Sequence, residues 1–369
     1  MMITKKPINE TKIVVAMSGG VDSSVVACLL KEQGYQVIGI TLQLYDLGEA
    51  LKKKNACCAG VDIMDAKNVA WKYNFPHYVL NYQNLFKQEV IDDFADSYLK
   101  GETPIPCVRC NQSVKFRDLM KVAKDLDADA LATGHYVQRI VNQQGVAEMH
   151  KAFDENKDQS YFLFTTTQEQ LDFLRFPLGG VDKETTRKNA VRLGLEIANK
   201  PDSQDICFVP NGNYAEVVKN LRPTAFKSGD IIHFESKKIL GKHNGIINFT
   251  LGQRKGIGIA YPEPLYVIKI DPQNNQILVG EEHYLNNHKF TIKNINWLAG
   301  DKKIDQSIAV MARLRSNHQE QPATLTIHSN DTATVIMKSA TRAITPGQAC
   351  VFYQKTKMLG GGWISSNIE

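Results

Sequence analysis

The sequence predicts an α/β protein in three parts: a parallel-sheet domain over residues 1–210, a small β-rich domain over 211–282, and a β-barrel over 283–369. Three observations lead to this fold class. Apolar strands alternate with amphipathic helices through the first part. A Ser-Gly-Gly-Val-Asp-Ser turn follows the first strand. Beyond residue 210 the pattern changes to short strands separated by Gly, Pro, Asn and Asp.

The alternation in the first part predicts a parallel sheet with helices on both faces. We expect strands at Lys12–Met17, Gln36–Leu42, His77–Leu80 and Ala130–Gly134. We expect helices at Asp22–Gln33, Asp62–Tyr73, Gln88–Lys100, Lys115–Leu126 and Thr185–Leu193. In such sheets ligands bind at the carboxyl ends of the strands. Both the 18–23 turn and the Thr133–His135 turn fall at such ends.

The remaining two parts carry the strand pattern alone. For the small domain we expect strands at Ile231–Phe234, Ile246–Phe249, Tyr266–Ile270 and Gln276–Val279. For the barrel we expect Ser307–Leu314, Ala323–Ile327, Thr332–Met337 and Ala349–Phe352. Many short strands with regular turns are typical of small closed sheets.

The turn at Ser18–Ser23 is a candidate phosphate cradle. Gly19 and Gly20 let the backbone approach phosphate oxygens without a Cβ in the way. The helix that follows directs its free N–H groups and positive dipole end toward an anion. No Gly-Lys-Ser/Thr follows, so this is not a Walker loop, and it lacks the dinucleotide fingerprint. A plain turn with a serine N-cap rarely needs two glycines and two serines around an Asp. Such loops are typical of enzymes that split ATP between the α and β phosphates and transfer AMP to a substrate oxygen.

Composition narrows the class of protein. The chain of 369 residues is 43% hydrophobic and 22% charged, which is ordinary for a globular protein. The opening Met-Met-Ile-Thr-Lys-Lys-Pro has no apolar h-region, and no apolar run reaches the length of a membrane span, so we expect a cytoplasmic protein with no membrane partner. Residues 1–209 carry a net charge of −2 and residues 210–369 carry +7. A basic second half favours a polyanionic substrate such as RNA, although a solvated surface would explain the charge alone.

Seven cysteines are present, at 28, 57, 58, 107, 110, 207 and 350. Their odd number in a chain without a secretory signal argues against a disulfide framework. Cys107-Val-Arg-Cys110, which we place in a loop, and Cys207 are the chemical candidates, with Arg109 and Lys115 expected to give them thiolate character. Three interpretations stay open. The first is a zinc site, for which the sequence offers no fourth ligand. The second is an iron–sulfur cluster held by Cys107, Cys110 and Cys207, which would leave one iron without a protein ligand. The third is a reactive pair, Cys110 and Cys207, that passes sulfur as a persulfide and closes a transient disulfide. We favour the pair and assign no residue to a metal.

Several motifs, in order along nearly the whole chain, resemble the tRNA-specific 2-thiouridylase family. They are Ser18–Ser23, Pro106–Gln112 with Lys115-Phe116, Thr133–Tyr136, Lys157–Leu163, Asp202–Phe208, Leu251–Gly256 and Pro346–Ala349. The Lys-Asp-Gln-Ser-Tyr and Gly-Gln-Arg-Lys-Gly strings are specific to that resemblance.

The resemblance implies ATP-dependent 2-thiolation of the wobble uridine of tRNAs for Lys, Glu and Gln, with Mg²⁺ on the ATP phosphates. Cys110 matches the nucleophile of the family and Cys207 its persulfide carrier. The ATP contacts match Ala16, Met17, Ser18, Gly19, Gly20, Val21, Asp22, Ser23, Leu42 and Gly134. The tRNA contacts match Lys157, Asp158, Gln159 and, in a looser register, Arg315. The implied partners are tRNA and a sulfur-donor protein, either a cysteine desulfurase or a relay protein.

One position departs from the pattern. Many family members carry Asp where this chain has Cys107, and that Asp is assigned an acid–base role. The replacement removes or moves that role and makes a cluster of three cysteines easier to build. Two other functions stay open at this point: an amide-forming adenylating synthetase, which would not need Cys207, and an RNA-binding nucleotide sensor, which would release no pyrophosphate.

Overall fold

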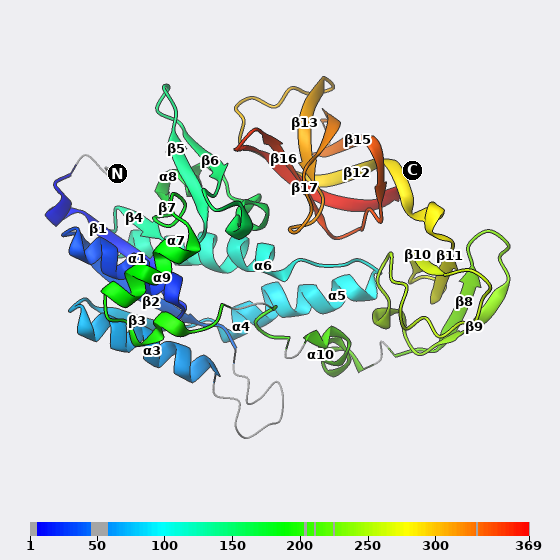
Figure 1. The fold of residues 1–369 in the computed structure, drawn as a ribbon, viewed down its shortest axis with the longest axis horizontal. Helices are drawn as coiled ribbons and strands as arrows, with labels where there is room; N and C mark the ends of the chain where they lie inside the picture. The colour runs from blue at the N-terminus through cyan, green and yellow to red at the C-terminus, as the bar shows by residue number, and fades with distance from the viewer. Residues whose placement is uncertain are drawn as a thin grey trace. The chain divides into compact units, whose positions relative to one another are not determined.

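The computed structural model describes residues 6–45, 58–202, 205–209, 212–223, 226–329 and 331–368. The chain divides into two compact units (Figure 1). The first comprises residues 1–90, 107–208 and 356–358, and the second comprises 91–106, 209–355 and 359–369.

A five-stranded parallel sheet forms the centre of the first unit, in the order β3-β2-β1-β4-β7 (Figure 1). Its strands are β1 (Lys12–Ala16), β2 (Gln36–Gln43), β3 (His77–Asn81), β4 (Ala130–Ala132) and β7 (Leu174–Arg175). The first four strands were expected from the sequence, and the short β7 was not. The parallel-sheet fold class is confirmed.

The core of this unit follows from the two-residue period of β1. Ile13 and Val15 face a cluster that takes in helices α1 (Val21–Glu32), α3 (Cys58–Lys72) and α9 (Lys183–Arg192). The fully buried Val14 lies between them in sequence, so its side chain points to the opposite face. Burial of both faces is what a parallel sheet requires, and it explains why β1 reads as a continuous apolar run.

The other elements of the first unit are mostly helical. They are α4 (Gln83–Phe86), α6 (Pro106–Arg109), a π-helical stretch at Cys110–Asp118, α7 (Leu119–Asp125), α8 (Gln168–Phe173), and 3₁₀ turns at Glu155–Lys157, Ser160–Leu163 and Glu196–Asn199. A second π-helical stretch, Lys87–Asp92, joins α4 to α5 (Asp93–Leu99). A hairpin of β5 (Val137–Val141) and β6 (Ala147–Lys151) was missed, although its turn is marked by Asn142, whose Oδ1 accepts from the N–H groups of Gln144 and Val146 at 3.0 Å.

The second unit contains a four-stranded sheet in the order β10-β11-β8-β9. Its strands are β8 (Gly229–His233), β9 (Ile239–His243), β10 (Tyr266–Asp271) and β11 (Gln276–Gly280). Helices α5 and α10 (Tyr214–Leu221) belong to the same unit, where Arg222 at the end of α10 pairs with Asp92 and Asp96 at 3.0 and 2.9 Å.

Six antiparallel strands form the expected barrel. They are β12 (Asn286–Trp297), β13 (Ser307–Arg313), β14 (Gln321–Ile327), β15 (Thr332–Arg342), β16 (Ala349–Gln354) and β17 (Lys357–Ile368). Pairing of β12 with β17 closes the sheet on itself. The first and last of these strands were missed, because long strands with bulges and a Gly-Gly-Gly run lack a clean alternation of apolar and polar residues.

One predicted strand is wrong. Residues Ile246–Asn248 form a 3₁₀ turn after Gly245, whose φ is +120°. The Asn248 amide donates back to the carbonyls of Asn244 and Gly245 at 3.3 and 3.2 Å, and this local bonding competes with strand pairing.

Among the described residues, no helix has the length and apolar character needed to cross a membrane.

The barrel closure depends on Gly360. A Cβ at this position would lie 2.2 Å from the carbonyl oxygen of Asn296, on the strand that Gly360 pairs with. We therefore expect Gly360→Ala to cost at least about 2 kcal/mol of stability and to lower the thermal midpoint. Gly180→Ala, where a Cβ meets nothing within 4 Å, is the matched control. Equal midpoints for the two variants, followed by circular dichroism, would contradict this account.

Candidate active site

The candidate cradle, residues Ser18–Ser23, lies at the carboxyl end of β1 and opens into α1. The Ser23 hydroxyl accepts from the Ser18 N–H at 3.1 Å and lies 3.3 Å from the Ser18 hydroxyl. Gly20 is the N-cap of α1, and no side chain caps the helix. The first N–H groups of α1 have no carbonyl partner within the helix, so they are available to an anion.

Gly19 is required by its surroundings as well as by its backbone. Its φ is +74°, and a Cβ would lie 2.1 Å from the carbonyl oxygen of Asp62 on α3. Lys200 links the turn at Gly19 to α3. Its ammonium donates to the Gly19 carbonyl at 3.1 Å and to Asp62 and Asp65 at 2.6 Å each. Burial lowers the pKa of Lys200, but the hydrogen bonds to the two carboxylates outweigh it and raise that pKa.

The structure brings Gly134 to the cradle, as the sequence predicted. A Cβ on Gly134 would lie 2.9 Å from the Ser23 nitrogen and 3.1 Å from Asp22. Ala16 and Leu42 lie near the carboxyl ends of the paired strands β1 and β2. His135 follows Gly134 and is paired through Nδ1 with the Thr133 hydroxyl at 2.9 Å. Burial, with the nearby charge of Lys115, lowers the pKa of His135 to about 3, so the ring is neutral.

Asp22 is held by residues that the sequence did not single out. The Lys183 ammonium donates to both of its carboxylate oxygens, at 2.7 and 2.8 Å. The Tyr136 hydroxyl donates to Asp22 Oδ1 at 2.9 Å and lies 2.9 Å from the Thr186 hydroxyl. Burial, the largest cause, and the charge of Asp22 raise the pKa of Tyr136. The sequence marks Tyr136 only as the last residue of the Thr133–Tyr136 motif.

Cys107 and Cys110 do not lie in a loop, contrary to expectation. Pro106 begins a helix at a position where its fixed φ is favourable, so both cysteines lie in the first turns. Cys110 begins the π-helical stretch and is buried, whereas Cys107 and Cys207 reach solvent. Phe208 is buried next to Cys207 and packs edge-on against Phe86 at 5.8 Å.

The three thiols lie within electrostatic range of one another. Crowding by protein atoms is the main cause that raises the pKa of Cys207 to about 12, and Cys110 and Cys107 add to the rise. Burial likewise raises the pKa values of Cys107 and Cys110. Lys115 lowers all three, but the expectation that it produces thiolates is wrong here, because desolvation outweighs its charge.

Two of the expected tRNA contacts have structural partners in the first unit. The Asp158 carboxylate accepts from the Ala152 N–H at 3.1 Å and from the Ser160 hydroxyl at 2.8 Å. The Gln159 side chain accepts from the Tyr136 N–H at 2.9 Å. Both side chains therefore shape the turn that carries them.

The two basic residues of that set also have acceptors. Lys157 donates to Asp202 at 2.9 Å in the first unit. Arg315, in the second unit, donates to the Ala343 carbonyl at 2.9 Å and to the Thr345 hydroxyl at 3.0 Å. An RNA phosphate would have to compete with these acceptors.

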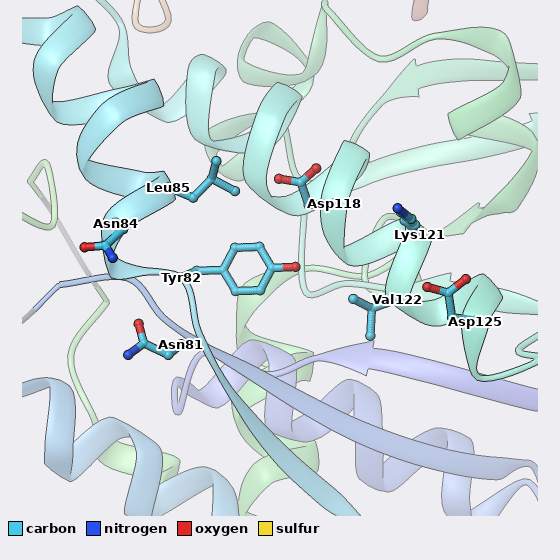
Figure 2. Close-up of a pocket in the computed structure, with 8 residues that line it drawn as sticks. All are labelled: Asn81, Tyr82, Asn84, Leu85, Asp118, Lys121, Val122 and Asp125. Atoms are coloured by element: carbon cyan, nitrogen blue, oxygen red, sulfur yellow. The ribbon is translucent and has the colours of Figure 1, made fainter.

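A separate cavity opens where β3 ends (Figure 2). It is lined by Asn81, Tyr82, Asn84, Leu85, Asp118, Lys121, Val122 and Asp125. Figure 2 shows the Tyr82 ring at its centre, below Asp118. No cradle residue and no cysteine belongs to this lining, so the cavity is distinct from the candidate active site.

Comparison with known proteins shows which family the chain belongs to. The model described as "tRNA methyl transferase HUP domain" matches residues 11–211, a PRC-barrel domain model of the same series matches 216–281, and an "aminomethyltransferase beta-barrel domain" matches 287–364. The tRNA-specific 2-thiouridylase MnmA of Rickettsia prowazekii is 60% identical over 97% of this chain and 99% of its own length. The chain belongs to the tRNA-specific 2-thiouridylase family.

Two further comparisons complete this picture. The MnmA of Rickettsia massiliae is 58% identical over 98% of both chains. Among solved structures, the U34-tRNA thiolase NcsA from Methanococcus maripaludis with its [4Fe-4S] cluster is 18% identical, covers 60% of this chain and 70% of that chain, and has a TM-score of 0.36. That likeness is too weak to bear on the cysteines of this family member.

The raised pKa of Cys207 has a measurable consequence. Only a thiolate reacts with iodoacetamide, so alkylation should be slow at pH 7 and should quicken about tenfold per pH unit up to pH 10. Lys115→Gln should slow it further, because Lys115 lowers this pKa. Mass spectrometry of the free protein measures the rate, with Cys207→Ser identifying the peptide. A rate that levels off below pH 9 would show that the thiol is already ionised.

Proposed function

We propose that this protein is a cytoplasmic enzyme that uses ATP to replace the C2 oxygen of the wobble uridine of tRNA by sulfur. One observation carries the proposal beyond family membership. The charge of Lys115 reaches all three thiols and also His135. His135 follows Gly134, where a Cβ would lie 2.9 Å from the Ser23 nitrogen of the cradle. This arrangement supports the proposal that phosphate chemistry and sulfur chemistry act on one substrate atom.

The first half of the reaction is adenylation. ATP would contact Ala16–Ser23, Leu42 and Gly134, with its phosphates against the N-terminus of α1. Mg²⁺ bound to ATP keeps water and phosphate ligands and needs only one or two protein carboxylates. Asp22 is the carboxylate of the cradle that could serve as such a ligand. The uridine, flipped out of the anticodon loop, would attack the α-phosphorus through its C2 oxygen. Pyrophosphate leaves, and C2 becomes electrophilic with a good leaving group.

The second half is sulfur transfer. The terminal sulfur of a Cys207 persulfide attacks C2, and AMP leaves with the original oxygen. The Cys110 thiolate then attacks the Cys207 sulfur, which releases 2-thiouridine and leaves a Cys110–Cys207 disulfide. An external thiol reductant must reopen that disulfide, and a sulfur-donor protein must reload Cys207. Because desolvation raises the pKa values of these thiols in the free protein, we infer that substrate binding changes their environment before sulfur transfer.

Two alternatives have less support. Methyl transfer, the reaction that the family-model descriptions name, requires neither ATP cleavage nor a pair of cysteines. A cluster-dependent thiolation requires a metal site, and the described part of the chain contains no group of three or more His, Cys, Asp or Glu side chains placed to hold a metal ion.

The proposal also includes a division of the chain into three domains, at residues 1–210, 211–282 and 283–369. In this division the basic second half of the chain provides the surface that binds tRNA.

Cysteine variants test the two halves separately. Cys110→Ser and Cys207→Ser should each abolish 2-thiouridine formation, because each removes a sulfur that the transfer requires. They should leave tRNA-dependent pyrophosphate release within a few-fold of wild type. Nucleoside mass spectrometry and a pyrophosphate assay measure the two steps.

Cys107→Ser is the matched control, since the persulfide route does not use Cys107. It should thiolate tRNA without added iron. Wild-type activity that appears only after anaerobic loading of iron and sulfide, together with loss of activity in all three variants, would favour the cluster. Full activity of Cys207→Ser would exclude both sulfur routes, and a methylated base with no pyrophosphate would favour methyl transfer.

Binding of tRNA should weaken steeply with salt, because phosphate neutralisation releases counterions. Lys157→Ala and Arg315→Ala should each reduce the slope of log affinity against log salt by about 0.7 if each contacts one phosphate of a single-stranded loop. Filter binding between low and high salt measures the slopes. Affinity that does not change with salt would contradict the assignment of tRNA to this basic surface.

A further inference from the structure

Lys200 joins the turn at Gly19 to helix α3. It directly follows a 3₁₀ turn, and its backbone is fixed there because its N–H donates to the Ile197 carbonyl at 2.9 Å. Its side chain is 28% exposed. The ammonium donates to the Gly19 carbonyl, 181 residues away in the chain, at 3.1 Å, and to one oxygen each of Asp62 and Asp65 at 2.6 Å. A lysine has three N–H donors, so these three acceptors occupy all of them.

The two carboxylates more than cancel the charge of Lys200. Asp62 and Asp65 are three residues apart on α3, so they lie on one face of that helix. Together with the ammonium they carry a net negative formal charge, which would repel a phosphate rather than attract it. Attraction by charge therefore does not account for a cluster of this composition beside a phosphate cradle, and its effect must come from geometry.

The contact with Gly19 fixes the direction of one peptide group. In a trans peptide the carbonyl and the N–H that follows it point in opposite directions. Because the Gly19 carbonyl faces Lys200, the Gly20 N–H points away from it. Gly20 is the N-cap of α1, and its N–H has no acceptor among the residues that the structure describes. One hydrogen bond from Lys200 thus sets the direction of a free donor in the cradle.

We propose that Lys200 is a positioning residue that aims the Gly20 N–H group at the pyrophosphate part of ATP. This inference rests on the proposed function, in which the ATP phosphates lie at this turn. Asp62 and Asp65 hold the ammonium, and the ammonium holds the Gly19 carbonyl. The opposite end of the same peptide group then meets the phosphate.

A glycine pair needs such a restraint more than other residues do. Glycine has the widest choice of backbone conformation, and rotation of the peptide between Gly19 and Gly20 would present a carbonyl oxygen to the phosphate in place of the N–H. Lys200 excludes that orientation before ATP binds, so binding does not have to order the turn. The adenosine part of ATP does not contact this peptide, so only ligands that carry the pyrophosphate depend on it.

The test measures the affinities of the intact, tRNA-free protein for pyrophosphate, ATP and adenosine by calorimetry. The variants are Lys200→Met, which keeps the length of the side chain without its donors, Lys200→Arg, and Asp65→Ala. The matched control is Lys72→Met. Lys72 also donates to a glycine carbonyl, that of Gly194, but it is the last residue of α3, at the end of the helix away from the cradle. Thermal melting checks folding.

We expect Lys200→Met to weaken binding of pyrophosphate and ATP at least about tenfold, the loss that follows when one hydrogen bond to a charged group is misaligned, with adenosine within about twofold. Lys200→Arg should recover most of the affinity, because it keeps donors for the carbonyl and the carboxylates. Asp65→Ala should weaken pyrophosphate binding about threefold, because the ammonium loses one of its two anchors, although removal of a negative charge alone would strengthen it. Lys72→Met should match wild type.

Tighter binding of pyrophosphate by Asp65→Ala would mean that charge rather than orientation governs the site, and would overturn the proposal. A folded Lys200→Met protein with wild-type affinity would overturn it too. So would equal losses for adenosine and pyrophosphate, the result expected of an ion pair that only stabilises the fold. If Lys200→Met does not fold, Asp65→Ala decides by the sign of its effect. A wild-type protein that binds neither ATP nor pyrophosphate would instead remove the proposed function, and this inference with it.

Discussion

The pairing of Asp22 with Lys183 connects the two halves of the α/β unit around one charge. A carboxylate at the N-terminus of α1 is favoured by the helix dipole, yet it lies where phosphates would bind and would repel them. Lys183 balances that charge from α9, and Tyr136 fixes its orientation. Lys183 also pairs with Asp202 at 2.9 Å, so one ammonium bridges two carboxylates that lie far apart in the chain.

The same arrangement recurs at the opposite side of the loop. Lys200 contacts the Gly19 carbonyl while Asp62 and Asp65 occupy its remaining donors. Lys183 and Lys200 are thus both already paired with carboxylates. The desolvation of these lysines is therefore met before ATP arrives.

Sequence patterns predicted those features that depend on neighbouring residues. The glycine turn, its helix and the parallel strands follow from local periodicity and backbone freedom, and Gly134 followed from its place at a strand end. Lys183, Lys200 and the role of Tyr136 did not, because their partners lie more than a hundred residues away and a lone lysine on a helix gives no local signal. The helix at Cys107 was missed because two prolines suggested a loop. Strands β12 and β17 were missed because bulges interrupt their period.

Desolvation by surrounding protein atoms is the main cause of the raised pKa values of the three thiols, although only Cys110 is a buried residue. A thiolate exposed beside Lys115 would react with any electrophile, whereas the raised pKa values keep all three sulfurs protonated in the free protein. Lys115 already lowers each value, so a modest change in packing, or a new positive neighbour, would shift the balance toward thiolate.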